Sequence, residues 1–295
     1  MCFMPASAKL IREFRRLVGT QPIFRPFLSV IFGAQYANHH FLRKTFLPFW
    51  SIFLTGEVHN FTYDLTDTNL RYLAEIISIV TGEAPEKVEA YFREVAEDEE
   101  LAEHIRASMK RANRGGARQS SAVFFGRRLG WYALVRATKP KTVIETGVER
   151  GHGSVLLCSA LLRNHNEGHP GRYFGTDINP NAGWLLGGRY ATVGKIIYGD
   201  SIESLRNLNE TIDIFINDSD HSADYEYQEY VTVTPKLSSG AMILGDNAHV
   251  TDKLARYARE HGRKFLFFKE SPKTHWYPGG GIGIAYWDRE ATHAR

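Results

Sequence analysis

Acidic residues stand at the ends of five short apolar runs in the second half of this 295-residue chain. They are Glu145, Asp177, Asp200, Asp218 and Asp246. If the runs are parallel strands, these carboxylates lie together at the carboxyl edge of one sheet, which is where open α/β sheets bind ligands. Carboxylates at that edge can accept hydrogen bonds from hydroxyl and amino groups, and they can coordinate a hard cation.

The glycine-containing segment VIETGVERGHGS, residues 143–154, joins the first of these runs to a predicted helix. A dinucleotide-binding loop would read G-x-G-x-x-G and would place a pyrophosphate at the helix N-terminus. Here Glu145 and Glu149 are expected to face that position, which disfavours an anion and suits a ligand with a cationic amino-acid end. Gly147 and Gly151 permit close approach of the ligand to the backbone.

The next two acids are placed to bind a nucleoside. Asp177, at the end of the second run, can accept hydrogen bonds from two ribose hydroxyls. Asp200, within YGDS at the end of the third run, is expected near an adenine amino group. Ribose, adenine and a zwitterionic tail together predict S-adenosylmethionine as the cofactor. The predicted cofactor contacts are Glu145, Thr146, Gly147, Gly151, Ser154, Asp177, Asp200, Ser201 and Asp218. The competing interpretation is turn glycines and helix-capping acids of another α/β fold.

The last two acids predict a metal site. Asp218 ends the fourth run, and Asp246-Asn247 ends the fifth. Three oxygen ligands on adjacent strand tips suit Mg²⁺, which would lower the pKa of a bound hydroxyl. His221, three residues after Asp218, is predicted to be the general base that takes the hydroxyl proton. The alternatives are acids that cap strands or contact only the cofactor, a structural histidine, and a cation-independent reaction.

Apolar runs alternate regularly with helical periodicity after residue 120. Strands are predicted at residues 141–146, 172–178, 195–200, 212–218, 241–247, 264–268 and 281–287. Helices are predicted at residues 152–165, 181–190, 201–208, 222–235 and 252–262. We therefore expect an α/β fold with a Rossmann-like, doubly wound, seven-stranded and mostly parallel sheet. Because no helix separates the last two strands, the last strand is expected to run antiparallel.

Over residues 121–295 the sequence resembles the class I S-adenosylmethionine-dependent methyltransferases. The resemblance rests on the glycine-containing loop, the ordered strand-end acids and the seven-strand pattern. It implies a methyltransferase domain that uses S-adenosylmethionine as methyl donor. The pattern of Asp218 followed by Asp246-Asn247 is similar to the cation-dependent O-methyltransferases of the catechol and caffeoyl-coenzyme A type, which implies Mg²⁺ or another divalent cation.

The D-x-x-H spacing of Asp218 and His221 is more similar to the macrocin and mycinamicin sugar O-methyltransferases and the related cephalosporin-hydroxylase-like family. By this resemblance Asp218, Asp246 and Asn247 would bind the metal, and His221 would be the base. Catechol-type enzymes have a lysine where His221 stands, which favours the sugar-modifying group. The expected acceptor is a hydroxyl of a sugar, a glycosylated compound or a phenol. A non-catalytic protein that binds the cofactor is the alternative from another class.

Residues 1–120 form a predicted helical region ahead of the methyltransferase domain. One helix is expected to begin at Thr66 or Asp67 and to end at Gly82. Residues 23–63 are rich in aromatic side chains, which suits a lid over the acceptor or a dimer contact. The aromatic residues there include Phe46, Phe49, Trp50, Phe53 and Phe61.

The composition excludes several other classes of protein. A net charge of +3 is too small to indicate a nucleic-acid partner, and two cysteines exclude a disulfide framework. The apolar blocks within residues 22–54 are far shorter than the roughly 20 residues of a membrane span, which leaves at most a peripheral association with membranes. Nothing at the N-terminus resembles a secretory signal. We therefore expect a cytoplasmic protein that acts on a small molecule, with a homodimer as the favoured oligomeric state.

Overall fold

The computed structural model describes residues 62–112 and 123–288, apart from His221, Asn247, Thr274 and Trp276. The described residues all belong to one compact unit, His59–Arg295. The aromatic residues predicted to form a lid or dimer contact lie outside the described residues, as do the predicted base His221 and the predicted metal ligand Asn247.

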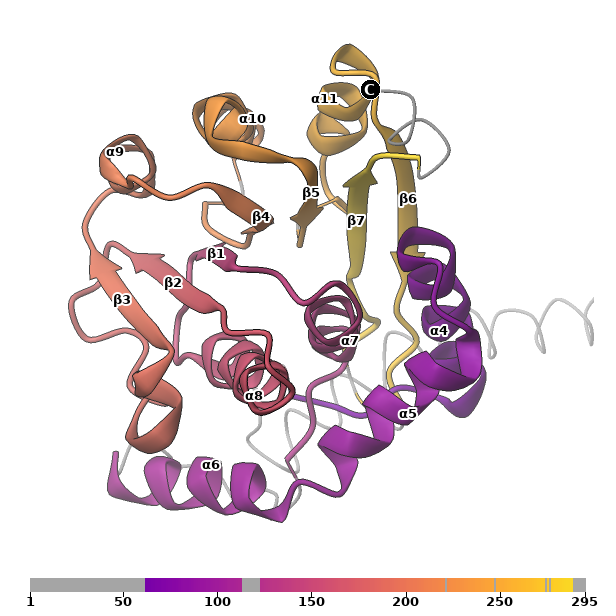
Figure 1. Ribbon diagram of the computed structural model, residues 1–295, viewed down its shortest axis with the longest axis vertical. Helices are drawn as coiled ribbons and strands as arrows, with labels where there is room; N and C mark the ends of the chain where they lie inside the picture. Colours follow the sequence, from indigo (N-terminus) through magenta and orange to yellow (C-terminus); the bar gives the residue numbers. More distant parts are fainter. Residues whose placement is uncertain are drawn as a thin grey trace, which may run out of the picture. The chain divides into compact units, whose positions relative to one another are not determined.

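One mixed sheet forms the centre of this unit (Figure 1). Its strands are β1 (Thr142–Thr146), β2 (Arg172–Asp177), β3 (Gly194–Tyr198), β4 (Ile212–Asn217), β5 (Leu237–Gly245), β6 (Lys264–Lys269) and β7 (Gly281–Tyr286). These seven strands of the described chain pair in the order β3-β2-β1-β4-β5-β7-β6. The strand pairs formed among β1, β2, β3, β4 and β5 are all parallel, whereas β7 is antiparallel to both β5 and β6. The predicted α/β fold with an antiparallel last strand is confirmed.

Helices cover both faces of the sheet, as Figure 1 shows. The α-helices are α4 (Asp67–Thr81), α5 (Pro85–Ala96), α6 (Glu99–Arg111), α7 (Arg128–Thr138), α8 (His152–Asn166), α9 (Ser201–Asn207), α10 (Ala223–Val233) and α11 (Lys253–Glu260). Helices α4 to α8 lie on one side, and α9, α10 and α11 lie on the other. This is the layered arrangement that a parallel sheet requires, because both of its faces must be buried.

The two cores receive alternate residues of the same strands. Along β4, Ile214 and Ile216 join the core on the side of α7 and α8, while Phe215 joins the core under α10 and α11. Side chains of a strand point to opposite faces in turn, so an unbroken apolar run supplies both cores. This is why the central strands appear in the sequence as continuous apolar runs.

Local signals set the helix boundaries that the sequence predicts. The Thr66 side chain accepts a hydrogen bond from the Asn69 N–H, and α4 ends at Gly82, whose φ is 70°. An N-cap hydroxyl and a left-handed C-terminal glycine are the usual boundaries of a helix. Helix α8 likewise starts directly after Gly151, whose φ of 92° favours a residue without a side chain.

Two helical segments differ from the prediction. The helix expected at 181–190 is wrong, since that region holds only the short 3-10 helix η3 (Gly188–Thr192). Gly183 and Gly188 have φ values of 70° and 56°, and a left-handed backbone at these two positions is incompatible with a continuous α-helix. Helix α7 was not predicted, yet it packs between α8 and the pair α4 and α5.

Helices α4 to α6 share one core with the sheet, since Leu73, Ile77 and Leu101 cluster with Trp131 of α7 and with strand residues such as Ile214. The predicted division of the chain near residue 120 stays a prediction, as do the homodimer and the absence of a nucleic-acid partner. Among the helices that the structure describes, none has the length and apolar character needed to cross a membrane.

Candidate functional site

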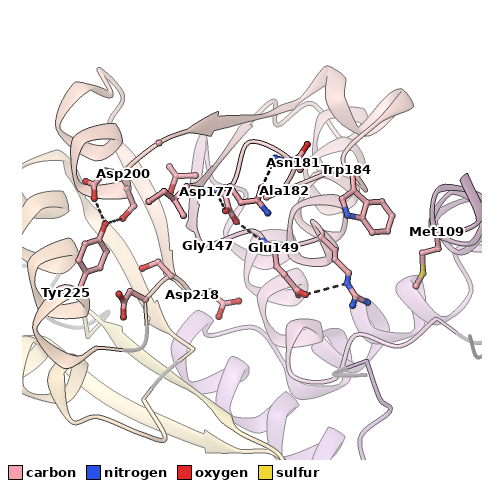
Figure 2. A pocket seen from close by; sticks show the side chains of 18 residues that line it. Met109, Gly147, Glu149, Asp177, Asn181, Ala182, Trp184, Asp200, Asp218 and Tyr225 are labelled. Carbon is pink, nitrogen blue, oxygen red and sulfur yellow. Dashed lines mark hydrogen bonds and ion pairs between the residues drawn. The ribbon is translucent and has the colours of Figure 1, made fainter. Parts of the chain in front are cut away.

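A cavity of about 850 Å³ opens at the carboxyl edge of the sheet. Its lining residues follow the ends of β1, β2, β3 and β4, which is the edge where open α/β sheets bind ligands. Figure 2 shows Asp200 and Tyr225 at one end, Trp184 and Met109 at the other, and Gly147, Asp177 and Asp218 between them. The predicted cofactor contacts that line it are Gly147, Asp177, Asp200, Ser201 and Asp218.

Gly147 brings the loop after β1 against the end of β4. Its φ is 77°, and a Cβ on this residue would lie 2.1 Å from the Asp218 carbonyl oxygen. Its N–H donates to the Thr176 carbonyl (2.8 Å), while the Asp218 N–H donates to the Thr146 carbonyl (2.9 Å). Only glycine fits here, so this position leaves a ligand free access to backbone.

Asp177 ends β2 and holds two loops in place. Its Oδ2 accepts hydrogen bonds from the N–H groups of Val148 (3.1 Å) and Glu149 (3.0 Å), and its Oδ1 accepts from Asn179 N–H (2.8 Å). A carboxylate offers about four lone-pair positions, so about one remains for a ligand. The two ribose hydroxyls of the prediction would therefore have to share it or replace a loop contact.

Asp200 and Ser201 begin α9 and are tied to Tyr225 of α10. The Asp200 carboxylate accepts from the Glu203 N–H (2.9 Å) and from the Tyr225 hydroxyl (2.8 Å). The Glu203 N–H in particular holds the pKa of Asp200 below its ordinary value, so the group is a charged acceptor. The Ser201 and Tyr225 hydroxyls also lie 2.8 Å apart. This corner therefore presents an anionic acceptor in a fixed position.

Glu145 does not reach the cavity, although it was predicted to face a ligand. It is 1% exposed and points into the core beneath α8, where it accepts hydrogen bonds from the hydroxyls of Tyr173 and Ser154. Burial is the main cause that raises its pKa to about 7. Of the two glutamates expected at this loop, it is Glu149 that lines the cavity.

Thr146, Ser154 and Gly151 also lie outside the cavity lining. The Thr146 hydroxyl donates to buried Glu229 of α10 (2.9 Å), and Ser154 belongs to the Glu145 network. Gly151 is the residue that starts α8. These residues support the shape of the loop, and a direct contact of each with the cofactor stays a prediction.

The acids predicted to bind a metal lie close to two arginines at the start of α7. Both carboxylate oxygens of Asp246 accept hydrogen bonds from Arg127, through its Nε and Nη2. Arg128 Nη2 lies 3.7 Å from Asp218 Oδ2. Burial would raise the pKa of Asp246, but the charge and hydrogen bonds of Arg127 outweigh it and hold that pKa below the ordinary value. Burial, followed by the charge of Asp246, raises the pKa of Asp218.

Comparison with known proteins bears on this site directly. Residues 144–248, which run from β1 to the end of β5 and include the cavity's strand-end acids, match the family described as a methyltransferase domain. This segment is a methyltransferase domain. The resemblance to class I methyltransferases is thereby confirmed, whereas the sugar-modifying subgroup stays a prediction.

The solved structures that are similar to this chain share a low percentage of identical residues with it. An O-methyltransferase from Bacillus cereus in complex with SAH is 14% identical and covers 65% of this chain and 92% of its own, with a TM-score of 0.44. The O-methyltransferase TomG from Streptomyces achromogenes, solved with SAM, is 15% identical and covers 68% and 96%, with a TM-score of 0.45. Cofactor-bound Rv0187 from MTB is 18% identical and covers 69% and 97%, with a TM-score of 0.48. No curated protein matches the sequence.

Of the three predicted metal ligands, only Asp218 and Asp246 are among the described residues, and both pair with arginines. Within residues 62–112 and 123–288, less the four residues named above, no group of three or more His, Cys, Asp or Glu side chains is placed to hold a metal ion. The predicted ligand set contains only two such residues, Asp218 and Asp246, so this finding does not decide it. Both carboxylate oxygens of Asp246 accept hydrogen bonds from Arg127, and the Asp218 carboxylate lies next to Arg128. Two guanidinium groups thus supply positive charge where the metal was predicted.

Several residues of the site were not predicted. Asn181, Trp184 and Tyr225 line the cavity of the methyltransferase domain, and Met109 reaches it from α6 (Figure 2). Tyr225 could have been suspected, because it follows the strand-end Asp218 at the start of a predicted helix. Met109 could not, because nothing in the sequence pairs α6 with this edge of the sheet.

Proposed function

We propose that this protein transfers the methyl group of S-adenosylmethionine to a hydroxyl group of a small molecule. The observation that carries the proposal is the cavity at the carboxyl edge of a methyltransferase domain, in which Asp177 and Asp200 end consecutive strands beside the Gly147 backbone. These groups offer acceptors for the ribose and adenine parts of the cofactor and a close approach for its amino-acid part.

The charges of the site support a cationic methyl donor. Asp177, Asp200, Asp218 and Glu149 line the cavity and present carboxyl groups, whereas Arg150 is the one basic residue among its described lining. Arg150 in turn lies 3.5 Å from the Glu149 carboxylate. A sulfonium ion with an ammonium group is favoured in such surroundings, and a pyrophosphate is not.

The proposed reaction is a direct displacement. The acceptor oxygen attacks the methyl carbon, the carbon–sulfur bond breaks, and S-adenosylhomocysteine leaves with the sulfur electron pair. The hydroxyl proton must pass to a base, and His221, three residues after the cavity residue Asp218, is our candidate. The chain holds the reactants in line and keeps water away, which supplies much of the rate enhancement in such transfers.

The acceptor is proposed to be a hydroxyl of a sugar or glycosylated compound, with a phenol as the second candidate. The D-x-x-H spacing of Asp218 and His221 supports the first choice, because it is similar to that of sugar O-methyltransferases. The Mg²⁺-dependent form of the reaction would need oxygen ligands from Asp218, Asp246 and Asn247. Because Arg127 and Arg128 pair with the two aspartates, we favour the cation-independent form.

Calorimetric titration with S-adenosylmethionine and S-adenosylhomocysteine tests cofactor binding. One site per chain is expected, and Asp177→Ala should weaken it at least about tenfold, or about 1.4 kcal/mol. Asp213→Ala is the matched control, because Asp213 also accepts two consecutive backbone N–H groups, those of Lys141 and Thr142, at the opposite end of the sheet. Equal weakening by both variants, or no binding by the wild type at millimolar cofactor, would contradict the proposal.

Transfer itself distinguishes an enzyme from a protein that only binds the cofactor. The protein is incubated with sugar, glycoside and phenol acceptors and with S-adenosylmethionine labelled in its methyl group. Label in an O-methyl product supports the proposed activity. Cofactor binding without any labelled product across these acceptors would support the non-catalytic alternative.

A further inference from the structure

The two arginines at the start of α7 pair with buried acids from distant parts of the chain. Arg127 joins Asp246 through both of its carboxylate oxygens and reaches Glu270, just after β6, through Nη1 (3.2 Å). The Arg127 side chain is only 11% exposed, and the side chains of Asp246 and Glu270 are 4% and 0% exposed. An ion cluster so far removed from water keeps its geometry, because separating the charges would leave them unpaired in the protein interior.

Glu270 fixes Arg127 at several points. Its carboxylate accepts from the Arg127 backbone N–H (3.2 Å), from the Gly280 N–H (2.7 Å) and from the Tyr63 hydroxyl (2.8 Å). The Tyr63 hydroxyl also accepts from Arg127 Nη1 (3.0 Å). The backbone N–H and the guanidinium group of Arg127, the N-cap residue of α7, are therefore both held by the same carboxylate. Arg127 is a positioned cation rather than a surface side chain that happens to reach an acid.

Arg128 provides a second cation to the neighbouring acid. Its side chain is 16% exposed, and its Nη2 lies 3.7 Å from the Asp218 carboxylate, which is 14% exposed. Its guanidinium stacks over Trp131, 5.4 Å from the ring centroid. Two consecutive residues thus send one guanidinium each to the two aspartates at the ends of β4 and β5. These are the strand ends at which a divalent cation was predicted.

We propose that Arg127 and Arg128 take the place of a divalent cation in this methyltransferase domain. They pair with Asp246 and Asp218 and keep both carboxylates from binding a metal. A metal ligated by Asp246 would lie about 2.1 Å from an oxygen that already accepts an Arg127 N–H group, so two like charges would be neighbours. The arginines hold the ends of β4 and β5 beside the cavity, which makes them positioning residues. The inference deepens the cation-independent form of the proposed function.

Titration with Mn²⁺ tests this proposal apart from catalysis. Metal-stripped, full-length protein is titrated with MnCl₂, and free Mn²⁺ is followed by its electron paramagnetic resonance signal. Wild type should show no site with a Kd below about 1 mM, the weak limit of the range known for protein Ca²⁺ sites. Arg127→Met should gain one site per chain at least about tenfold tighter than any in wild type, and Asp246→Asn in the same chain should remove it.

Controls keep the result independent of folding. Arg256→Met changes an exposed arginine that pairs with Glu260 and should leave Mn²⁺ binding unchanged. Arg127→Met leaves buried carboxylates unpaired, so its melting temperature is measured with and without Mn²⁺; Arg128→Met, which loses one longer contact, is the second variant. If neither variant folds, the wild-type titration decides.

Two results would overturn the proposal. One is a wild-type Mn²⁺ site tighter than about 1 mM that Asp246→Asn removes. The other is a folded Arg127→Met or Arg128→Met protein that binds Mn²⁺ no better than wild type. Cofactor titration on the same samples separates this failure from failure of the proposed function, because Asp246 is not among the residues that line the cofactor cavity.

Discussion

Replacing Glu145 with glutamine should make the protein more stable at alkaline pH. Burial raises the pKa of Glu145 from 4.5 to about 7, so the folded chain binds this proton more tightly than the unfolded chain does. A raised pKa contributes stability that is fully present below pH 4.5 and is lost as the pH rises through 7. At about 1.4 kcal/mol for each pKa unit, the loss amounts to about 3 kcal/mol.

Glutamine keeps the size of the side chain and an oxygen that can accept the Tyr173 hydroxyl, but it has no charge to bury. The free energy of unfolding by urea is measured for wild type and Glu145→Gln across the pH range in which the acid titrates. The variant should gain up to about 3 kcal/mol relative to wild type between the acidic and alkaline ends. Glu75→Gln, at an exposed position on α4, is the control and should show no such trend.

The same variant decides whether Glu145 contacts the cofactor. Its carboxylate lies in the core and outside the cavity lining, so the affinity for S-adenosylmethionine should change less than about threefold, which is under 1 kcal/mol. A difference in unfolding free energy that does not vary with pH would refute the assigned burial of a charge. A large loss of cofactor affinity with unchanged stability would restore the sequence-based role of Glu145 as a ligand of the amino group.

Two further predictions concern the loop after β1 and the N-terminal region of the sequence. Gly147→Ala should lower the melting temperature and abolish cofactor binding, because the new Cβ would lie 2.1 Å from the Asp218 carbonyl oxygen and φ is 77°; an alanine variant with wild-type calorimetric affinity would contradict this. Removal of residues 1–60 should spare cofactor affinity and abolish methyl transfer if these residues form the lid. Normal transfer by the shortened chain would exclude that role.

The strands could be predicted because each central strand is a short apolar run that serves two cores. Ile214, Phe215 and Ile216 pack on alternate faces, so the run contains no polar position that would blur its boundaries. The helix predicted at residues 181–190 was wrong because its apolar run is flanked by glycines. Trp184, Leu185 and Leu186 form a short apolar run, but the backbone of the flanking Gly183 and Gly188 is left-handed. The pattern of apolar residues indicates which side chains are buried. It gives no information on the φ values of the glycines, which set the direction of the chain.

The kinds of residue at the site could be predicted from the sequence, but the direction in which each acidic side chain points could be predicted less well. Glu145 lies within β1, two residues after Val143, so it faces the same α8-covered core as Val143. Strand periodicity alone could have assigned it to the interior. The loop residue Glu149 instead lies in the cavity. An acid before the end of a strand follows the alternation of the sheet, whereas an acid after the end is free to face the ligand.

The partner of the paired acids was beyond the reach of local motifs. Arg127 and Asp246 are 119 positions apart, and a D…DN pattern predicts only that some positive charge must neutralise the carboxylates. One local signal did exist, since arginines at the start of a helix oppose its macrodipole. A consecutive pair, Arg127-Arg128, at the start of α7 therefore requires acids from elsewhere in the fold. When a sequence has acids at its strand ends and also two consecutive arginines at the start of a helix, a guanidinium group is therefore favoured over a metal as the cation that pairs with these acids.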